Sequence, residues 1–371
     1  MKRKLFCLLL TSALVFCGAS CAGCAVQPGN TSSDGNSAED SNPNFEDYFA
    51  KLDMSYFSEN GYTITFLQKY SLTRHTDNEE ETADLTCEYE GTGSFTLLTE
   101  PAGGDAAEGR LDLFRNGRGY LDQSQREKAV YKTKETDKVY GESRESTETV
   151  DRNRYFRARF DEKTLYTAFR NEPDGDPTFE WSIEKDLLSD LLSDELLDRF
   201  VDGMIFVEGY SYLERLSGFS SGTLFAEESL SEEEMEKYTD PGDFAVRMED
   251  EVFTLEFSMY GDAVFDELKE NPAPDGSRAK IRVAIQYDTA AGQIVHFRFD
   301  LKEFLLSVFR LSQKEGETVN AQIDEFAIEG DRLNVPFDKT ALKGNFTAYT
   351  DAAAFLEKLG DYTSPTEGTA G

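Results

Sequence analysis

The chain has 371 residues, of which 72 are Asp or Glu and 38 are Lys or Arg, giving a formal net charge of −34. This excess of negative charge disfavours nucleic acid as a partner, and it disfavours adsorption of the folded part to an anionic lipid surface, because both are negatively charged. The length is sufficient for one large domain or two smaller ones. The 28 Phe and 17 Tyr residues supply a large aromatic area for a core.

The first 24 residues have the three parts of a secretory signal. A basic tip (KRK) precedes an apolar core at residues 5–16 (LFCLLLTSALVF), and small residues follow at 17–24 (CGASCAGC). The apolar core is shorter than the roughly 20 residues that a membrane-spanning helix needs. We therefore predict that residues 1–24 are a signal peptide and that the mature protein is exported.

The small-residue segment resembles the bacterial lipobox, in which a Leu-like residue and two small residues precede a cysteine that is lipidated after cleavage. Cys17 follows the bulky Phe16 and does not fit this pattern. Two small residues precede Cys21 (Ala-Ser) and two precede Cys24 (Ala-Gly), but neither cysteine has the usual leucine three residues before it. The resemblance implies lipidation of Cys24, with Cys21 as the alternative, because Ala-Gly-Cys is the commoner ending.

Residues 25–44 (AVQPGNTSSDGNSAEDSNPN) have the composition of a flexible linker that reaches about 25 Å. A lipidated cysteine carries the two chains that stable membrane attachment requires. We therefore expect an extracytoplasmic protein that is lipid-anchored to the membrane of a bacterial cell envelope. The alternative is a secreted protein with an ordinary cleavage site and a disulfide between Cys21 and Cys24.

The first half of the predicted single domain, residues 45–360, is rich in strands. Apolar residues in 44–57 (NFEDYFAKLDMSYF) recur at helical spacing and predict one amphipathic helix. Alternating patterns and sharp turns then predict an antiparallel meander. Its strands are expected within residues 62–74, 82–98, 109–123 (with a turn at Asn116-Gly117), 128–135 and 154–170.

A Leu-rich helix over residues 182–202, with Ser182 as its N-cap, is expected to divide the domain into two β-rich halves. In the second half, residues 251–260 alternate as one strand, and residues 280–301 predict a hairpin that turns at 288–292. In this hairpin Ile281, Val283, Ile285 and Tyr287 are expected to face Val295, Phe297, Phe299 and Leu301.

Four further helices are expected in the second half, and they have different end signals. A capping box, Ser231 with Glu234, precedes the first of them. The last has a cap at each end, and residues 361–371 are expected to be a disordered tail. The expected helices are residues 231–238, 262–271, 301–313 and 350–360.

Candidate catalytic and metal-binding residues are sparse. The stretch Gly218–Gly222 (GFSSG) matches the G-x-S-x-G motif with Ser220 as nucleophile, which makes a serine hydrolase a remote alternative. The only downstream histidine, His296, falls on the polar face of a predicted strand, and no zinc, phosphate or dinucleotide motif is present. The acidic turn around Gly175 departs from the calcium-loop spacing. We predict no catalytic, metal or cofactor site.

An arginine cluster, RNRYFRAR at residues 152–159, interrupts the acidic trend. Pairing of Arg152, Arg154, Arg157 and Arg159 with acidic residues on neighbouring strands is the favoured interpretation. An anion-binding patch is the alternative.

The order of elements behind a lipobox-like signal resembles the bacterial lipoproteins of the LolA/LppX-like class. The phrases LFRNGRGYLDQ and YDTAAGQIVHFRFDL are similar to the strand-turn-strand phrases of that class. The resemblance implies an α+β fold, in which a strongly curved antiparallel sheet forms a half-barrel with helices on its concave face. It also implies that a lipid or another hydrophobic molecule binds between sheet and helices.

These observations predict a non-enzymatic, membrane-anchored lipoprotein that binds a hydrophobic ligand. A cell-envelope interaction or sensor module, with a filled core and a protein partner on its acidic surface, is the alternative. An enclosed cavity of several hundred Å³ under the sheet would distinguish the first from the second.

Overall fold

The structure is a computed structural model of the whole chain, and it describes residues 61–100, 110–170, 177–207, 209–224, 232–273, 276–314, 316–342 and 344–363. All of these residues belong to one unit, Phe49–Gly371. The predicted signal, Cys21, Cys24, the linker and the predicted helix at 44–57 lie outside the described residues. Those predictions therefore stay predictions.

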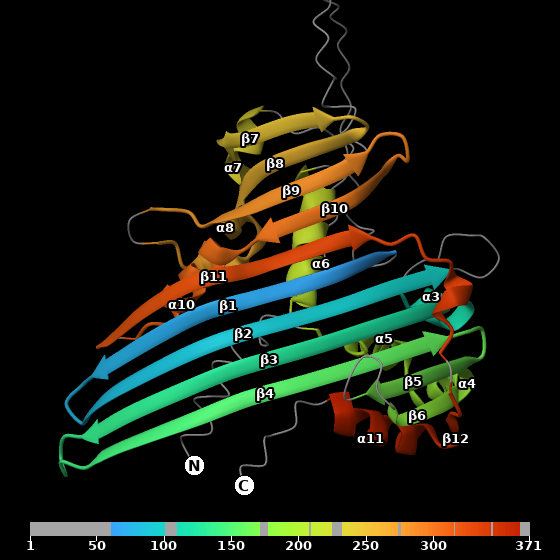
Figure 1. Cartoon of the computed structure of the whole chain (residues 1–371), viewed down its shortest axis with the longest axis horizontal. Helices are drawn as coiled ribbons and strands as arrows, with labels where there is room; N and C mark the ends of the chain where they lie inside the picture. The colour runs from blue at the N-terminus through green and yellow to red at the C-terminus, as the bar shows by residue number, and fades with distance from the viewer. Residues whose placement is uncertain are drawn as a thin grey trace, which may run out of the picture. The chain divides into compact units, whose positions relative to one another are not determined.

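Twelve described strands form one large curved sheet that is open at both edges (Figure 1). Their spatial order is β12-β6-β5-β4-β3-β2-β1-β11-β10-β9-β8-β7, and every pairing is antiparallel except β12 with β6. The strands are β1 (Tyr62–Asp77), β2 (Glu81–Glu100), β3 (Arg118–Asp137), β4 (Ser143–Phe160), β5 (Thr164–Arg170), β6 (Pro177–Glu184), β7 (Thr239–Glu249), β8 (Val252–Tyr260), β9 (Lys280–Asp288), β10 (Gln293–Asp300), β11 (Glu317–Arg332) and β12 (Thr347–Tyr349).

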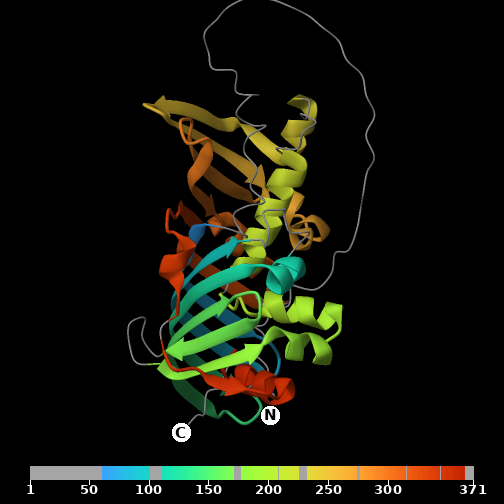
Figure 2. The same cartoon turned by 90° about the vertical axis from the view of Figure 1, so that its right-hand side faces the viewer.

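The described helices are short, and the α-helices lie against one face of the sheet (Figure 2). The 3-10 turn at Phe337–Thr340 lies on the other face, where Arg118 and Arg159 cover the ring of Phe337. The prediction of helices combined with a curved antiparallel sheet is confirmed at this level. The helices are α3 (Arg110–Asn116), α4 (Lys185–Leu191), α5 (Asp194–Gly203), α6 (Tyr210–Phe219), the π-helical turn η4 (Ser220–Leu224), α7 (Glu232–Tyr238), α8 (Gly261–Val264), α9 (Asp266–Glu270), α10 (Lys302–Leu311), the 3-10 turn η5 (Phe337–Thr340) and α11 (Ala352–Thr363).

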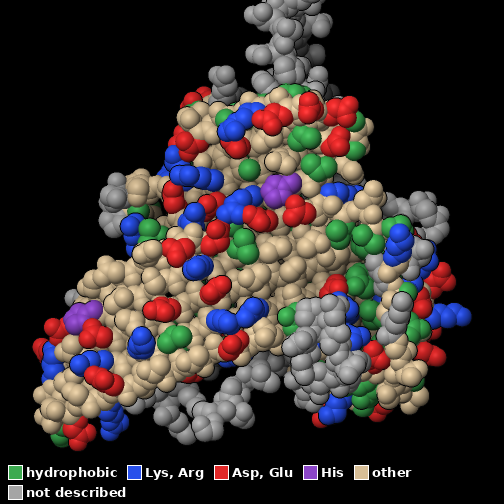
Figure 3. All heavy atoms as spheres, in the orientation of Figure 1, with side chains coloured by type: hydrophobic (Ala, Val, Ile, Leu, Met, Phe, Trp, Pro, Cys, Tyr) green, Lys and Arg blue, Asp and Glu red, His purple; other side chains and the backbone are tan. Residues whose placement is uncertain are grey.

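Side chains alternate between two faces of the sheet, as strand geometry requires. The face that the helices cover is called here the inner face, and the opposite one the outer face. In β8 the inner positions Phe253, Leu255, Phe257 and Met259 are buried, as their alternation predicted. On the outer face, side chains of both charge signs are spread over the strands (Figure 3).

Strand β11 joins the two halves of the domain. It pairs with β1 from the first half along almost its whole length, and with β10 from the second half near its end. The sequence analysis did not predict a strand over these residues. Their alternation is visible afterwards (TVNAQIDEFAI), but a β-bulge between Ile323 and Glu325 shifts the apolar positions from odd to even residue numbers and hides the pattern.

Five aromatic rings fill the space between the centre of the sheet and the helices above it. Tyr212 of α6 is the middle of this cluster, with ring centroids 5.6–6.2 Å from those of its four neighbours. The neighbours are Phe66 of β1, Phe326 of β11, Phe265 between α8 and α9, and Phe304 of α10. Such tilted and edge-on ring pairs add stability beyond the area that they bury.

Helix α6 approaches the sheet closely because Gly209 precedes it. This glycine has a φ of +92°, which disfavours any side chain, and a Cβ at this position would lie 2.5 Å from the ring of Phe66. Glycine therefore satisfies a backbone and a packing requirement at the same residue.

The predicted central helix over residues 182–202 is wrong in part. Ser182 lies in β6 and is not an N-cap, and the helical stretch is broken at Leu192 into α4 and α5. Ser193 caps the second helix, because its side chain accepts a hydrogen bond from the Leu196 N–H. A good N-cap inside an apolar repeat therefore started a new helix.

Several other predictions need correction. Residues 118–123 and 128–135 belong to one strand, β3, and residues 154–170 contain the end of β4 and the whole of β5. Residues 110–116, expected to begin a strand, form α3. A β-bulge between Ile294 and His296 places Ile294, rather than Val295, opposite Tyr287, and Leu301 lies beyond the end of β10. Helices 262–271 and 350–360 also differ: the first is interrupted at Phe265, and α11 continues through Gly360 into the predicted tail.

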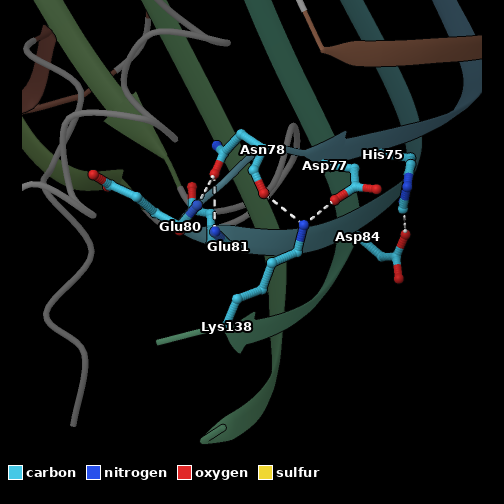
Figure 4. A network of polar contacts seen from close by, with 7 residues as sticks. All are labelled: His75, Asp77, Asn78, Glu80, Glu81, Asp84 and Lys138. Atoms are coloured by element: carbon cyan, nitrogen blue, oxygen red, sulfur yellow. Dashed lines mark hydrogen bonds and ion pairs between the residues drawn. The ribbon is translucent and has the colours of Figure 1, made fainter. Parts of the chain in front are cut away.

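Polar contacts hold the turns at the far ends of β1 and β3 together (Figure 4). The Lys138 ammonium donates to the Asp77 carboxylate and, at 2.5 Å, to the Asn78 carbonyl. The Asn78 side chain accepts from the N–H groups of Glu80 and Glu81 at 2.9 and 2.8 Å. These contacts connect the turn after β1 to the turn after β3. The hydrogen bond from Lys138 also lowers the pKa of the Asp77 carboxyl.

We expect the substitution Gly330→Ala to destabilise the protein by about 1–3 kcal/mol, the usual range for overpacking. Gly330 of β11 lies opposite Phe297 of β10, and a Cβ there would come within 2.0 Å of the phenyl ring. Urea unfolding followed by circular dichroism measures the change.

Gly218→Ala is the matched control for this variant. A Cβ at residue 218 of α6 meets nothing within 4 Å, so the helix should be unchanged or stabilised by up to about 1 kcal/mol. Equal effects of the two substitutions would contradict the proposed role of Gly330.

Candidate functional site

The sequence analysis expected a ligand between the sheet and the helices, and over β1–β4 this inner face has an unusual composition. Register places Gln68, Gly91, Glu127 and Arg152 side by side in one row across the four strands. The next row along the strands holds Phe66, Gly93, Gln125 and Arg154. Polar side chains therefore share this face with apolar ones.

Three of these polar residues are buried. Gln125 is 5 % exposed, and Gln68 and Glu127 are similarly covered. The Oε1 atom of Gln125 accepts no hydrogen bond from the residues that the structure describes. A buried polar atom without a partner is costly, so this position favours an additional hydrogen-bond donor.

Apolar side chains extend the same face toward the far ends of the strands. The rings of Tyr70 and Tyr89 stack with centroids 5.0 Å apart, and Ala129 lies opposite Tyr89 in register. Gly91 permits this arrangement, because a Cβ there would lie 2.8 Å from the Tyr89 ring. The inner face of β1–β3 thus combines stacked rings, small residues and a few polar groups.

The segment between α5 and α6 borders this face. The Gln123 amide donates to the Met204 carbonyl, and its oxygen accepts from the Phe206 N–H at 3.0 Å. The Arg154 guanidinium lies over the Phe206 ring, 5.1 Å from its centroid. Side chains of β3 and β4 therefore hold the connection to α6 in place.

The arginine cluster is divided between the two faces of β4. Arg157 pairs with Asp122 of β3 at 3.0 Å, which confirms for this residue the predicted cross-strand ion pair. Arg154 and Arg159 instead lie over aromatic rings, those of Phe206 and Phe337. The cluster does not form one anion-binding patch, because alternate residues of a strand point to opposite faces.

The serine hydrolase alternative is wrong. Ser220 follows helix α6 rather than a strand, so the strand-turn-helix elbow of such enzymes is not formed. The side chain is fully buried, and its hydroxyl has no hydrogen-bond partner within the described ranges. His296 lies on the outer face of β10, where its ring Nδ1 is 2.8 Å from the Asp331 carboxylate.

No other chemistry-bearing cluster emerges from the described part of the chain. Within it, no group of three or more His, Cys, Asp or Glu residues is placed to hold a metal ion. The same residues include no helix with the length and hydropathy of a membrane span. Cys87 is buried in β2, while Cys21, Cys24 and the acidic turn around Gly175 lie outside the described residues.

Lys185 is a buried cation that the sequence analysis placed on a helix and otherwise passed over. The residue is 3 % exposed, and its ammonium donates to the carbonyls of Phe114 and Arg115 at 2.5 and 3.0 Å. It also lies over the rings of Phe114 and Phe160. Lys185 thereby ties the end of α3 to the start of α4.

The inner-face polar residues were also missed, although the pattern contained them. Leu121, Gln123, Gln125, Glu127 and Ala129 share one phase of β3, so an inward-facing Leu121 places the other four inward too. Composition alone suggested an exposed strand, because Gln and Glu are usually solvated.

Comparisons with known proteins identify no family. No family model matches the chain, and no curated protein matches it. Among solved structures, the chain is similar to the crystal structure of a β-barrel-like protein of the domain of unknown function DUF1849 from Brucella abortus. That similarity has a TM-score of 0.14 and 9 % sequence identity, and it covers 74 % of this chain and 97 % of the other.

The contribution of Lys185 to stability should depend on pH. Burial lowers its pKa from 10.5 to about 8, while the carboxylates of Asp161, Asp186 and Glu162 partly oppose this shift. Between these two pH values the unfolded chain binds the proton and the folded chain does not, so the free energy of unfolding rises with pH. The rise amounts to at most about 3 kcal/mol.

Lys185→Met removes this titration while keeping a long apolar side chain in the same space. We expect wild type to gain stability relative to the variant from about pH 8 to pH 10.5. Urea unfolding of both proteins across this range measures the difference. A constant difference would show that Lys185 titrates normally in the folded state.

Proposed function

We propose that this protein is a lipid-anchored, extracytoplasmic binding protein without catalytic activity, which holds a lipid or another hydrophobic molecule against the inner face of β1–β4. The anchor is a lipidated Cys24, with Cys21 as the alternative, and the linker at 25–44 separates the folded part from the membrane. The proposal keeps the LolA/LppX-like interpretation of the fold.

The composition of the inner face is the observation that carries the proposal. Binding sites for small molecules are mainly apolar and contain a few placed polar groups that orient the ligand. The stacked rings of Tyr70 and Tyr89 provide apolar area, and Gln125 provides a buried acceptor without a partner in the described part of the chain. An amphiphile with a hydrogen-bond donor in its polar end suits this combination.

Ala129→Phe tests the location of the ligand. The side chain of Ala129 is buried on the inner face, so a phenyl ring there should compete with the ligand for space. We expect the purified variant to carry about tenfold less lipid than the wild-type protein, and to take up a dansyl-labelled fatty acid about tenfold more weakly. Native mass spectrometry and probe fluorescence measure these quantities.

Val130→Phe is the matched control, because Val130 is the next residue of β3 and faces the outer side. It should bind as wild type does. If Ala129→Phe fails to fold, Gln125→Leu is the second variant. It keeps the size of the side chain, removes the polar group, and should still weaken binding of the labelled fatty acid. Wild-type protein that carries no lipid and takes up no probe would refute the proposal.

A second candidate function is favoured by the five-ring cluster. The cluster fills the space between β1, β11 and α6, with centroids of Phe265 and Phe304 only 4.3 Å apart. A domain filled in this way throughout would act as an interaction or sensor module with an envelope protein partner. Absence of both extracted lipid and probe uptake is the result that would favour this function.

The anchor has its own test. Mass spectrometry of the mature N-terminal peptide should show a diacylglyceryl group on Cys24, and Cys24→Ala should abolish the modification or move it to Cys21. Cys17→Ala is the control and should change nothing, because residue 17 belongs to the predicted signal. An unmodified mature terminus, or a disulfide between Cys21 and Cys24, would refute the anchor.

A further inference from the structure

The outer face of the sheet carries a pocket of about 450 Å³ over β8, β9 and β10. Register arranges its floor as two rows of three residues. Glu256, Ala284 and Arg298 form one row, and Ser258, Arg282 and Asp300 form the other. Ala284 lies in the middle of the first row. Its side chain is small and those around it are mostly longer, so a hollow forms above it.

An excursion of the edge strand β7 builds one wall of this pocket. Register passes from Asp240, opposite Ser258, directly to Ala245, opposite Glu256, so residues 241–244 leave the ladder. Lys280 holds the excursion, because its ammonium contacts Asp240 at 2.5 Å and Asp243 at 2.9 Å. Asp243 also accepts a hydrogen bond from the side chain of Ser258, which is 2 % exposed.

Most charges around the pocket already have partners. Arg298 is bound by Glu325 and Glu329, and Asp300 pairs with Lys302 at 3.1 Å. Glu256 pairs with Arg247 at 2.8 Å, in an exposed contact. Such an exposed ion pair contributes little stability, so its carboxylate can exchange partners at low cost.

Arg282 is the exception. This exposed residue occupies the middle of the second row and, like the hydrogen bond from Lys280, its charge lowers the pKa of Asp243. Within the described part of the chain, however, it forms no ion pair or hydrogen bond. Figure 3 shows side chains of both charge signs gathered over β8–β10 on this face. The pocket therefore offers one cation that is not hydrogen-bonded within the described ranges, beside several carboxylates.

The charges decide which class of ligand fits. A guanidinium binds a carboxylate through two parallel hydrogen bonds. A simple anion would also meet the carboxylates of Asp243, Glu256 and Asp300, and a simple cation would meet Arg282. A molecule that carries both a carboxylate and an ammonium group avoids both repulsions.

We propose that this outer-face pocket binds a small zwitterion of the amino acid or short peptide class, with its carboxylate on Arg282 and its ammonium toward Glu256 and Asp300. The volume accommodates a dipeptide. The site lies on the opposite face from the proposed hydrophobic ligand, so it neither requires nor excludes that ligand.

Calorimetric titration of the folded protein with L-alanyl-L-alanine tests the proposal. The N-acetylated dipeptide lacks the ammonium group, and the C-terminal amide lacks the carboxylate. We expect the free dipeptide to bind and each blocked form to bind at least about tenfold more weakly, because each loses a charge-assisted hydrogen bond. Equal binding of all three, or no binding of the free dipeptide at about 10 mM, would overturn the proposal.

Two variants assign the binding to this pocket. Arg282→Gln removes the proposed partner of the dipeptide carboxylate and should weaken dipeptide binding at least about tenfold. Ala284→Leu fills the hollow without changing charge and should have a similar effect. Unchanged affinity in both variants would show that the dipeptide binds elsewhere.

Controls match each substitution. Arg199→Gln removes an exposed arginine on α5, far along the chain from this pocket, where it pairs with Glu195. Thr254→Leu adds leucine to the outer face of β8 outside the lining residues. Both should bind the dipeptide as wild type does, and circular dichroism should show all four variants folded.

Discussion

The pairing of β11 with both β1 and β10 is the contact on which the rest of the structure depends. Strand β1 comes from the beginning of the domain and β10 from near its end, so this pairing turns two groups of strands into one sheet. Phe326 projects from β11 into the ring cluster around Tyr212, and Gly330 admits the ring of Phe297. The same strand therefore closes the ladder and anchors the helices.

A single wide sheet gives the protein two faces with different physical character. On the inner face, helices and aromatic rings cover the strands, so polar side chains such as Gln125 are buried there, and a hydrogen bond left unmade is costly. On the outer face, charges are exposed and mostly paired, and a hollow arises where a small residue such as Ala284 meets the excursion of β7. The two proposed ligands follow this division: a hydrophobic molecule on one side and a zwitterion on the other.

Most strands were predictable from the sequence, and several helices were not. Period-two patterns in β8 and β9 survive because each strand has one buried and one exposed face. The predicted helix at 182–202 was wrong for two reasons. Its first residues are the end of β6, and Ser193 caps a second helix inside the stretch. The spacing of apolar residues shows neither. The bulge at Ile294 shifted the inward residue by one, a change that no local pattern shows.

The sequence by itself determined the acidic charge and most of the strands, and it predicted a signal with lipidation candidates, because these depend on neighbours along the chain. Tertiary structure decided what depends on residues far apart. Gln125 became a buried acceptor, and Ser220 was separated from any histidine base. Arg282 forms no ion pair or hydrogen bond in the described part of the chain, while Arg298 gained two ion pairs. Strand pairing decides these outcomes, because it sets which side chains meet across the sheet and which face water.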